Sequence, residues 1–449
     1  MRSNEPEFLG HPKGLAFLFA TEMWERFSYY GMRALLVLYM VNYLLKPERA
    51  NEVLGLSALK GGLEAVSGPL EAQPFSSHIY GLYTSLVYAT PILGGLVADR
   101  WLGRRRTVAL GAALMVAGHF VMASEQLFLL ALTLLILGNG AFKPNIVTQV
   151  GGLYAPHDLR RDRAFSVFYV GINIGAFFSP LVAGTLGETV GWAWGFGSAG
   201  VGMTIGLATY FYGLRYLPPD EARGVEAEAP SATRPSLGAS LVGLALLFVP
   251  AALLTCAYEQ QGNTIVLWAE RFTDRTVSLF GWSAEIPVTW FQAFNPLMVF
   301  LFTPPLVAWW GKLARRGREP FTIDKLAIGC FGIGAGYAIM AAAALSSLGA
   351  KASWLWLVAY FAIITWFELY FYPVALSLIS RIAPEDSRSL LMGLWLAASF
   401  AGNLFAGWFG GLWSSFSSVA FFALAAGVAG SAGAFILAAR PVLMRLLVR

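Results

Sequence analysis

Residues 22–33, EMWERFSYYGMR, place charged side chains inside a hydrophobic segment, 14–45, that is long enough to cross a bilayer. An α-helix turns about 100° per residue, so these charges share one stripe of the helix surface. A charge at the centre of a bilayer costs at least ~2.5 kcal/mol. We therefore expect the stripe to face a wet cavity or opposite charge rather than lipid. Its charged members are Glu22, Glu25, Arg26 and Arg33.

The rest of the chain has the composition of a membrane protein. Of its 449 residues 57% are hydrophobic and 13% are charged, and the mean hydropathy is +0.60. Apolar runs of at least ~18 residues predict helices, because lipid offers no other partner to the backbone. We expect an all-α membrane protein with twelve transmembrane helices. The predicted spans are 15–45, 78–98, 107–124, 127–149, 163–187, 192–215, 237–268, 286–310, 325–347, 353–380, 388–414 and 417–440.

The positions of the Lys and Arg residues predict the orientation. Most of them fall in loops on the cytoplasmic side if both termini lie in the cytoplasm. This asymmetry also accounts for the pI near 9.1, so the basic balance does not indicate nucleic-acid binding. Residues 1–14 hold two acids and no apolar core, so no signal peptide is expected.

The spans divide into six plus six around a polar segment, LPPDEARGVEAEAPSATRPSL, that is rich in Pro, Ala and Glu. A basic loop, 94–106, follows the second span, and a similar loop, 309–320, follows the eighth. Such an echo is typical of transporters built from two parallel repeats. We expect a six-helix bundle over 1–215, a cytoplasmic linker over 216–236 and a second six-helix bundle over 237–449.

Several motifs resemble one family. DRWLGRRR, 99–106, is similar to the loop signature of the major facilitator superfamily, and ExxERFxYYG, 22–31, resembles the first-helix motif of the proton-coupled oligopeptide transporters (POT family). The resemblance implies the fold of that superfamily and proton-driven import of di- and tripeptides. It also implies a bacterial inner-membrane monomer with no cofactor. Further matches are GNGAFKPN (138–145), FYVGIN (168–173), EQQGNT (259–264), NPLMVFLFTPP (295–305) and ELYFYPVALSL (368–378).

The chain departs from the family pattern at two places, and it also lacks a histidine that the animal members carry. The linker is too short for the two extra helices of many bacterial members. Leu254, Thr255 and Cys256 stand where the family usually has Phe-Trp-Ala, so one aromatic wall of the side-chain pocket is missing. Gly81 stands where animal members carry a histidine in the second span.

A short peptide is a zwitterion whose ends lie a fixed distance apart while its side chains vary. Its site needs a cationic pole, an anionic pole and a roomy apolar wall. The first six spans supply Arg26, Arg33 and Lys143, and the last six supply Glu259 and Glu368. Opposite charges on the two bundles suit a dipolar ligand.

Family resemblance assigns the peptide carboxylate to Arg26 and Lys143, and the peptide amine to Glu368 with Asn173 and Asn295. Lys143 also lies near a helix end, from which it could extend to the membrane surface. Each asparagine is equally consistent with a helix-to-helix hydrogen bond. Glu368 has no basic residue within a turn, so it must find a partner on another helix.

Aromatic positions give the least specific signal. Tyr29, Tyr30, Tyr88 and Trp395 resemble pocket-lining positions of the family, and we select Tyr30, Tyr88 and Trp395 as candidates for substrate contact. In a chain with 14% aromatic residues, most such side chains belong to the core or the membrane interface.

Glu22, Glu25 and Arg26 are the candidates for proton coupling. A carboxylate beside an arginine is ionised, and it loses that partner if a peptide carboxylate binds the arginine instead. Protonation and substrate binding would then compete for Arg26. The alternative is a structural Glu–Arg network. Resemblance also suggests two salt bridges between the bundles, Arg33 with Glu259 and Lys143 with Glu368.

Other classes of protein fit less well. A proton-driven drug exporter would share the fold, and a transporter of another small anion would lack Glu368 as amine ligand. An enzyme would need a nucleophile with a base or a metal set, whereas the four His are isolated and no HExxH or GxSxG occurs. A channel is disfavoured because the charges do not form rings. We expect peptide, protons and lipid as partners, and no enzymatic activity.

Overall fold

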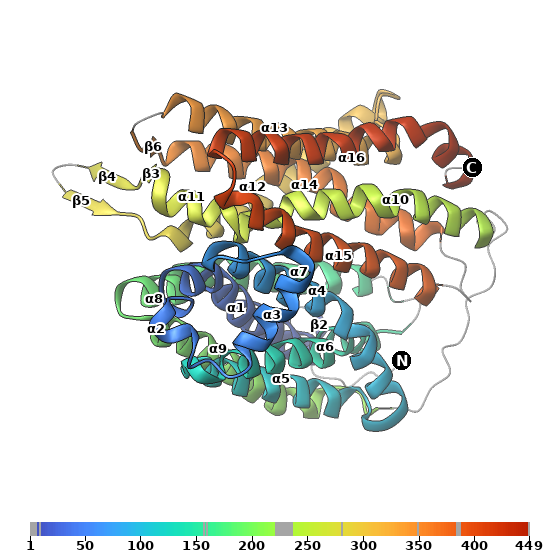
Figure 1. Ribbon diagram of the computed structural model, residues 1–449. Coiled ribbons are helices and arrows are strands. Elements are labelled where there is room, and N and C mark those ends of the chain that lie inside the picture. Colours follow the sequence, from blue (N-terminus) through green and yellow to red (C-terminus); the bar gives the residue numbers. More distant parts are fainter. Residues whose placement is uncertain are drawn as a thin grey trace. The chain divides into compact units, whose positions relative to one another are not determined.

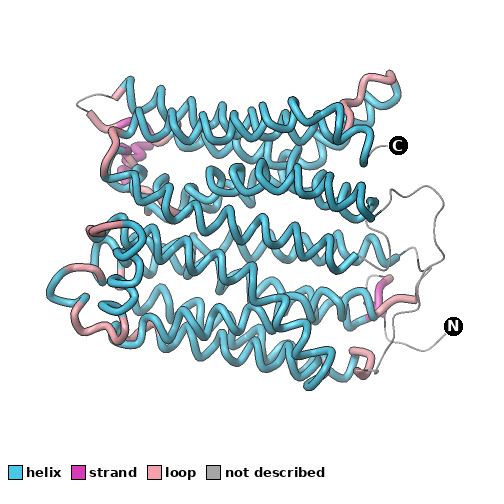
Figure 2. The backbone as a smooth tube through the Cα atoms, turned by 45° about the vertical axis from the view of Figure 1, so that its right-hand side comes forward, coloured by secondary structure: helices cyan, strands magenta, loops and turns pink. Residues whose placement is uncertain are grey.

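The computed structural model describes residues 7–8, 10–155, 158, 160–220, 237–279, 282–347, 350–382 and 388–447. Helices make up nearly all of this part of the chain, and strands are confined to a few short pieces (Figure 2). Nine helical segments among the described residues are long and apolar enough to cross a membrane. The expected all-α membrane protein is therefore confirmed.

Three further expected spans also form long helices, although they fall outside those nine. They are α1 (Lys13–Tyr39), α5 (Arg104–Val121) and α9 (Trp192–Gly213). Charged residues lower the hydropathy of α1 and α5, and α9 is rich in Gly and aromatic residues. Each of the twelve expected spans thus coincides with a long helix in the described part of the chain.

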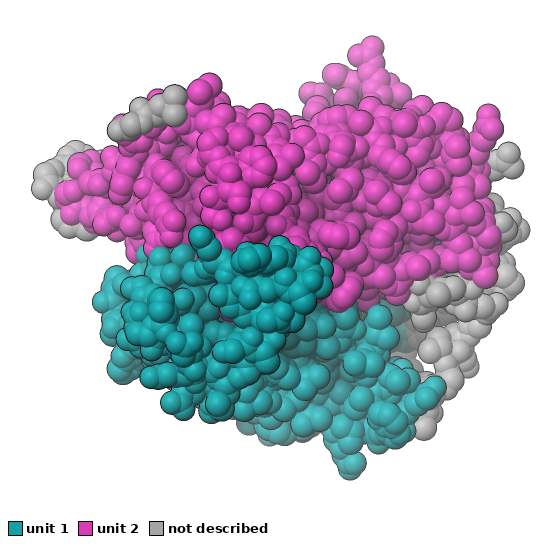
Figure 3. All heavy atoms as spheres, in the orientation of Figure 1, with its two compact units in different colours: residues 1–72, 86–223 teal, residues 73–85, 224–449 magenta. Residues whose placement is uncertain are grey.

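The chain packs into two compact units (Figure 3). Unit 1 comprises Met1–Ala72 and Leu86–Arg223, and unit 2 comprises Gln73–Ser85 and Gly224–Arg449. The expected bundles, 1–215 and 237–449, stay predictions, and the packing additionally places Gln73–Ser85 with unit 2. Most of the expected linker, 221–236, lies outside the described residues.

Unit 1 is built around α1, which packs against α7 and α9, while α5 packs against α6 and α9 (Figure 1). Short π-helical segments follow α1, α4 and α7. The elements not yet bounded are β1 (Glu7–Phe8), β2 (His11–Pro12), the π-helix Met40–Leu44, α2 (Pro47–Ala50), α3 (Leu56–Ser67), α4 (Ala72–Val97), the π-helix Ala98–Leu102, the 3₁₀ turn Glu125–Leu127, α6 (Phe128–Gly152), α7 (Arg160–Ser179), the π-helix Pro180–Gly184, α8 (Thr185–Thr189) and the 3₁₀ turn Leu214–Tyr216.

In unit 2, α13 packs against α14 and α16, and α10 packs against α15 and α16. The elements are α10 (Leu237–Tyr258), the 3₁₀ segment Glu259–Gly262, α11 (Thr264–Phe272), β3 (Thr273–Asp274), β4 (Thr276–Leu279), β5 (Trp282–Glu285), the 3₁₀ segment Val288–Ala293, α12 (Phe294–Arg315), α13 (Thr322–Ser346), β6 (Ala352–Ser353), α14 (Leu355–Ile382), α15 (Arg388–Gly411), the 3₁₀ turn Leu412–Ser414 and α16 (Ser418–Leu447). Strands β4 and β5 form an antiparallel hairpin, and β3 pairs with β6 in parallel.

Glycines let the helices approach closely, which is how membrane helices gain packing energy without a hydrophobic driving force. A Cβ at Gly94 of α4 would lie 2.0 Å from the carbonyl oxygen of Gly140 on α6. At Gly175 of α7, a Cβ would lie 2.2 Å from the carbonyl oxygen of Met23 on α1. The backbones of α7 and α1 are therefore in contact directly beside the charged stripe.

Gly175→Ala is expected to destabilise the protein, because the added methyl group meets α1 backbone that a rotamer change cannot move. Overpacking of this kind costs about 1–3 kcal/mol. A lower melting temperature in detergent, followed by tryptophan fluorescence, measures the loss. Gly427→Ala on α16 is the matched control, because a Cβ there has no heavy atom within 4 Å. Equal melting temperatures for both variants would contradict the close contact.

Candidate functional site

The charged stripe of α1 forms a buried cluster of Glu22, Glu25 and Arg26, which we call the α1 cluster. Both glutamates are 0% exposed and Arg26 is 3% exposed. Arg26 binds Glu25 through two hydrogen bonds, from Nε to Oε2 and from Nη2 to Oε1, the second at 2.6 Å. The Arg26 guanidinium also lies 5.0 Å from the ring centroid of Tyr29. As expected, the charges face each other rather than lipid.

The two glutamates of this cluster differ in their hydrogen bonding. Glu25 accepts both bonds from Arg26 and a third from Asn139 Nδ2 at 3.2 Å. Glu22 Oε1 lies 3.4 Å from Arg26 Nε, but neither Glu22 oxygen accepts a hydrogen bond from the described residues. A proton on Glu22 therefore disturbs no hydrogen bond to that carboxylate from the described residues, whereas Glu25 already accepts three.

Helix α6 adds Lys143 and Asn139 to the α1 cluster. The Lys143 ammonium interacts electrostatically with Glu22, Glu25 and Arg26, so it belongs to the same group of charges. Asn139 lies four residues earlier and hence on the same face of α6. Asn139 is not among the residues predicted from the sequence. Two features of the sequence indicate Asn139: it lies four residues before Lys143, and it places an amide inside an apolar span.

The other unit 1 candidates differ in burial and in their contacts. The Tyr30 ring meets the Tyr29 ring edge to face, with centroids 5.2 Å apart. Arg33 is half-buried, and Tyr88 of α4 is 36% exposed. Asn173 donates from Nδ2 to the carbonyl oxygen of Tyr169 in its own helix, at 3.0 Å. That donor thus bonds within its own helix rather than to a neighbouring one.

Unit 2 holds Glu368 in a network of uncharged donors. Tyr258 Oη donates to Glu368 Oε2 at 2.6 Å, and Asn295 Nδ2 donates to the same oxygen at 2.6 Å. Asn295 Nδ2 also lies 3.0 Å from Thr365 Oγ1. The carboxylate thus finds partners on two other helices, as expected, and Asn295 makes the helix-to-helix bond. Tyr258, which is not among the residues predicted from the sequence, immediately precedes Glu259.

Glu259 begins the 3₁₀ segment that separates α10 from α11, where the sequence predicted one continuous span over 237–268. It is 4% exposed and accepts a hydrogen bond from Tyr80 Oη at 3.1 Å. Trp395 stacks on Phe371 with centroids 6.2 Å apart and remains half-buried. The two candidate carboxylates of unit 2, Glu259 and Glu368, therefore each accept a hydrogen bond from a tyrosine hydroxyl.

The first half of α4 packs tightly against α15 and the segment before α11. Ser77 Oγ donates to Asn263 Oδ1 at 2.9 Å. A Cβ at Gly81 would lie 2.5 Å from the Cα of Gly407. The two helices therefore touch at a glycine pair, with no space for a side chain at position 81.

In unit 1, outside the apolar spans, Asp158 accepts hydrogen bonds from Arg160 at 2.9–3.1 Å. These bonds hold the pKa of Asp158 below its ordinary value. A lowered pKa means that the stabilisation is present above the ordinary carboxylate range and is lost only in stronger acid. This pair therefore stays ionised near neutral pH and does not exchange protons there.

Comparison with known proteins gives a consistent result. Residues 105–222 and 238–426 match the model of the POT family. The peptide transporter YePEPT of Yersinia enterocolitica subsp. palearctica is 35% identical over 476 residues, which is 90% of this chain and 88% of the relative. A di-/tripeptide transporter of Lactococcus lactis subsp. cremoris is also 35% identical, over 89% of each chain.

Solved structures agree with the sequence relatives. A crystal structure of peptide transporter POT in complex with sulfate has a TM-score of 0.84 and 29% identity, and the match covers 99% of this chain and 97% of that one. A mutant of peptide transporter POT in complex with alafosfalin gives a TM-score of 0.83 with 29% identity and the same coverage.

Proposed function

The chain belongs to the POT family of membrane transporters, and on that premise we propose that it imports di- and tripeptides together with protons. The proposal extends to a multi-pass monomer in the lipid of the cell inner membrane, with both termini cytoplasmic, that works by alternating access. Two relatives are named as transporters of peptides or of di- and tripeptides, which supports the substrate class. The buried charges support the mechanism.

The peptide carboxylate binds Arg26 and Lys143 in this proposal, and the peptide amino group binds Glu368. Three arguments support it. Lys143 and Arg26 belong to one group of charges. Among the described residues, the side chains that donate to Glu368 are the neutral Tyr258 and Asn295, so its charge is available to a cationic ligand. Charge-assisted hydrogen bonds are about twice as strong as neutral ones, which suits recognition by the peptide termini alone.

The other candidate residues keep supporting roles. Asn295 orients Glu368 through its hydrogen bond, and Tyr30, Tyr88, Asn173 and Trp395 line the site. Arg33 and Glu259 are proposed to form a salt bridge that breaks during the transport cycle, as are Lys143 and Glu368. These assignments rest on the family resemblance.

Glu22 is the proton carrier in this proposal, and Glu25 is the permanent partner of Arg26. The single observation that carries it is the difference in hydrogen bonding, since Glu25 has three donors and Glu22 has none among the described residues. A peptide carboxylate that approaches Arg26 weakens the 3.4 Å attraction between Arg26 and Glu22. Glu22 then binds a proton, so that binding of the peptide and binding of the proton are coupled.

The alternative is a proton-coupled transporter of another small anion or drug on the same fold. It would retain the α1 cluster but would not need Glu368. The anchored carboxylate of Glu368 therefore favours a ligand with a positive amino group.

Uptake into proteoliposomes tests the proposal directly. An acidic exterior and alkaline interior are expected to concentrate a labelled dipeptide inside, and a protonophore should leave exchange only. A panel of unlabelled di- and tripeptides should compete, whereas a dipeptide with both ends blocked should not. Equal accumulation with and without the gradient would contradict proton coupling, and competition by blocked peptides would contradict terminal recognition.

A further inference from the structure

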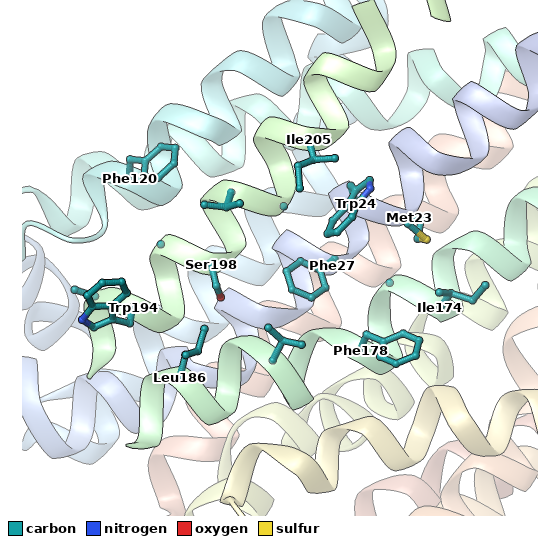
Figure 4. A pocket seen from close by; sticks show the side chains of 16 residues that line it. Met23, Trp24, Phe27, Phe120, Ile174, Phe178, Leu186, Trp194, Ser198 and Ile205 are labelled. Carbon is teal, nitrogen blue, oxygen red and sulfur yellow. The ribbon is translucent and has the colours of Figure 1, made fainter. Parts of the chain in front are cut away.

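An apolar groove of about 680 Å³ lies on unit 1 and is lined by residues of α1, α7, the π-helix Pro180–Gly184, α8 and α9, with Phe120 of α5 (Figure 4). We propose that this groove binds one acyl chain of a membrane lipid. The volume falls in the usual range for small-molecule sites, about 300–1,000 Å³. The site is independent of the peptide and proton assignments above.

The chemistry of the lining selects the occupant. None of the sixteen lining residues carries a charge, and all but a serine are glycine, alanine or larger apolar and aromatic residues. That serine, Ser198, donates its hydroxyl to the Gly195 carbonyl oxygen of its own helix at 2.7 Å. The lining therefore offers almost nothing to a peptide or a headgroup, and it suits a hydrocarbon chain.

The groove is continuous with the surface that faces the bilayer. Phe178 of α7 and Val201 and Ile205 of α9 line it and are 51%, 53% and 40% exposed. Helix α7 lies within one of the segments long and apolar enough to cross a membrane. In a membrane these side chains meet lipid tails, so the occupant reaches the groove from the surrounding hydrocarbon.

Close helix packing at the base makes the groove a defined site. A Cβ at Gly202 would lie 2.6 Å from the Phe27 ring, so α9 rests on α1 there. At Gly197, by contrast, a Cβ would have no heavy atom within 4 Å. The base of the groove is therefore closely packed, whereas its wall has open space at Gly197.

The α1 residues of the groove alternate in sequence with those of the α1 cluster. Met23, Trp24 and Phe27 point away from Glu22 and Arg26 at 100° per residue, so the two sets occupy opposite faces of α1. An acyl chain in the groove therefore packs behind the charged face of α1 and supports it from the lipid side.

Photolabelling tests the site. The purified protein is reconstituted with phosphatidylethanolamine that carries a diazirine in one acyl chain, irradiated and mapped by mass spectrometry. We expect labelling at Trp24 and Phe178 to exceed labelling at Leu437, a 46% exposed residue of α16. Gly197→Leu should lower labelling in the groove on the order of tenfold, which corresponds to excluding about two methylene groups.

Two comparisons make the result decisive. Gly427→Leu adds the same side chain at an open glycine of α16 and should leave groove labelling unchanged. Labelling at Leu437 should not respond to either substitution. Groove labelling equal to that of Leu437 and insensitive to Gly197→Leu would overturn the proposal, because the groove would then be ordinary lipid-facing surface. Cross-links from the groove to a second copy of the chain would overturn it in favour of an interface.

Discussion

Glu22→Gln is expected to abolish accumulation of a dipeptide against its gradient while leaving exchange of labelled for unlabelled dipeptide close to the wild-type rate. Glutamine has nearly the same volume but cannot take up a proton, and the bonds of Arg26 to Glu25 stay intact. Exchange does not require return of the empty carrier, so it survives the loss of the proton site. Both assays run on the same proteoliposomes, with and without an imposed pH gradient.

Glu25→Gln distinguishes the role of the Glu25 carboxylate from that of Glu22. It removes the negative charge of the side chain that accepts two hydrogen bonds from Arg26, and the Arg26 charge stays buried without it. We therefore expect Glu25→Gln to impair exchange as well as accumulation. A size-exclusion profile like that of the wild type establishes that each variant is folded. Normal accumulation by Glu22→Gln, with selective loss of accumulation in Glu25→Gln, would show that Glu25 carries the proton instead.

Glu368→Gln is expected to weaken binding of an ordinary dipeptide roughly ten- to a hundredfold, the worth of a hydrogen bond to a charged group at about 1.5–3 kcal/mol. Binding of the same dipeptide with an acetylated amino group should hardly change, because that ligand has no cation for the carboxylate. Competition against a labelled dipeptide measures both affinities.

Tyr258→Phe is the control that alters how the Glu368 carboxylate is held without removing its charge. It removes the hydroxyl that donates to Glu368 at 2.6 Å but leaves the carboxylate and its bond from Asn295. A smaller loss than that of Glu368→Gln is expected, again confined to the peptide with a free amino group. Equal losses for free and acetylated peptides in Glu368→Gln would mean that the residue is structural.

Helical periodicity is enough to predict which face of α1 carries the buried charges. Because 100° per residue places its charges on one stripe, their mutual burial followed before any partner was known. Glu368 was predictable in the same sense, since a lone carboxylate in an apolar span requires donors from other helices. Its partners Tyr258 and Asn295 lie 110 and 73 residues away in the chain, and no local pattern identifies such pairs.

The interruption at Glu259 has a signal in the sequence, because EQQGNT (259–264) holds no apolar side chain and includes a glycine. The prediction of one continuous span over 237–268 passes over this signal, and tertiary contacts hold the break in place. Gln260 donates to the carbonyl oxygen of Ala406 on α15 at 3.0 Å, and Asn263 accepts from Ser77 on α4. Asn139 was missed because its role exists only where α6 meets Glu25.

The glycine pair of Gly81 and Gly407 limits how this chain could change over evolution. Animal members of the family carry an imidazole at the position that Gly81 resembles, but here even a methyl group would collide with the backbone of α15. A histidine could enter only after the two helices had moved apart, which takes several coordinated substitutions rather than one. In the proposed mechanism the protons are therefore handled without a histidine at this position, and the acids of the first helix take that role.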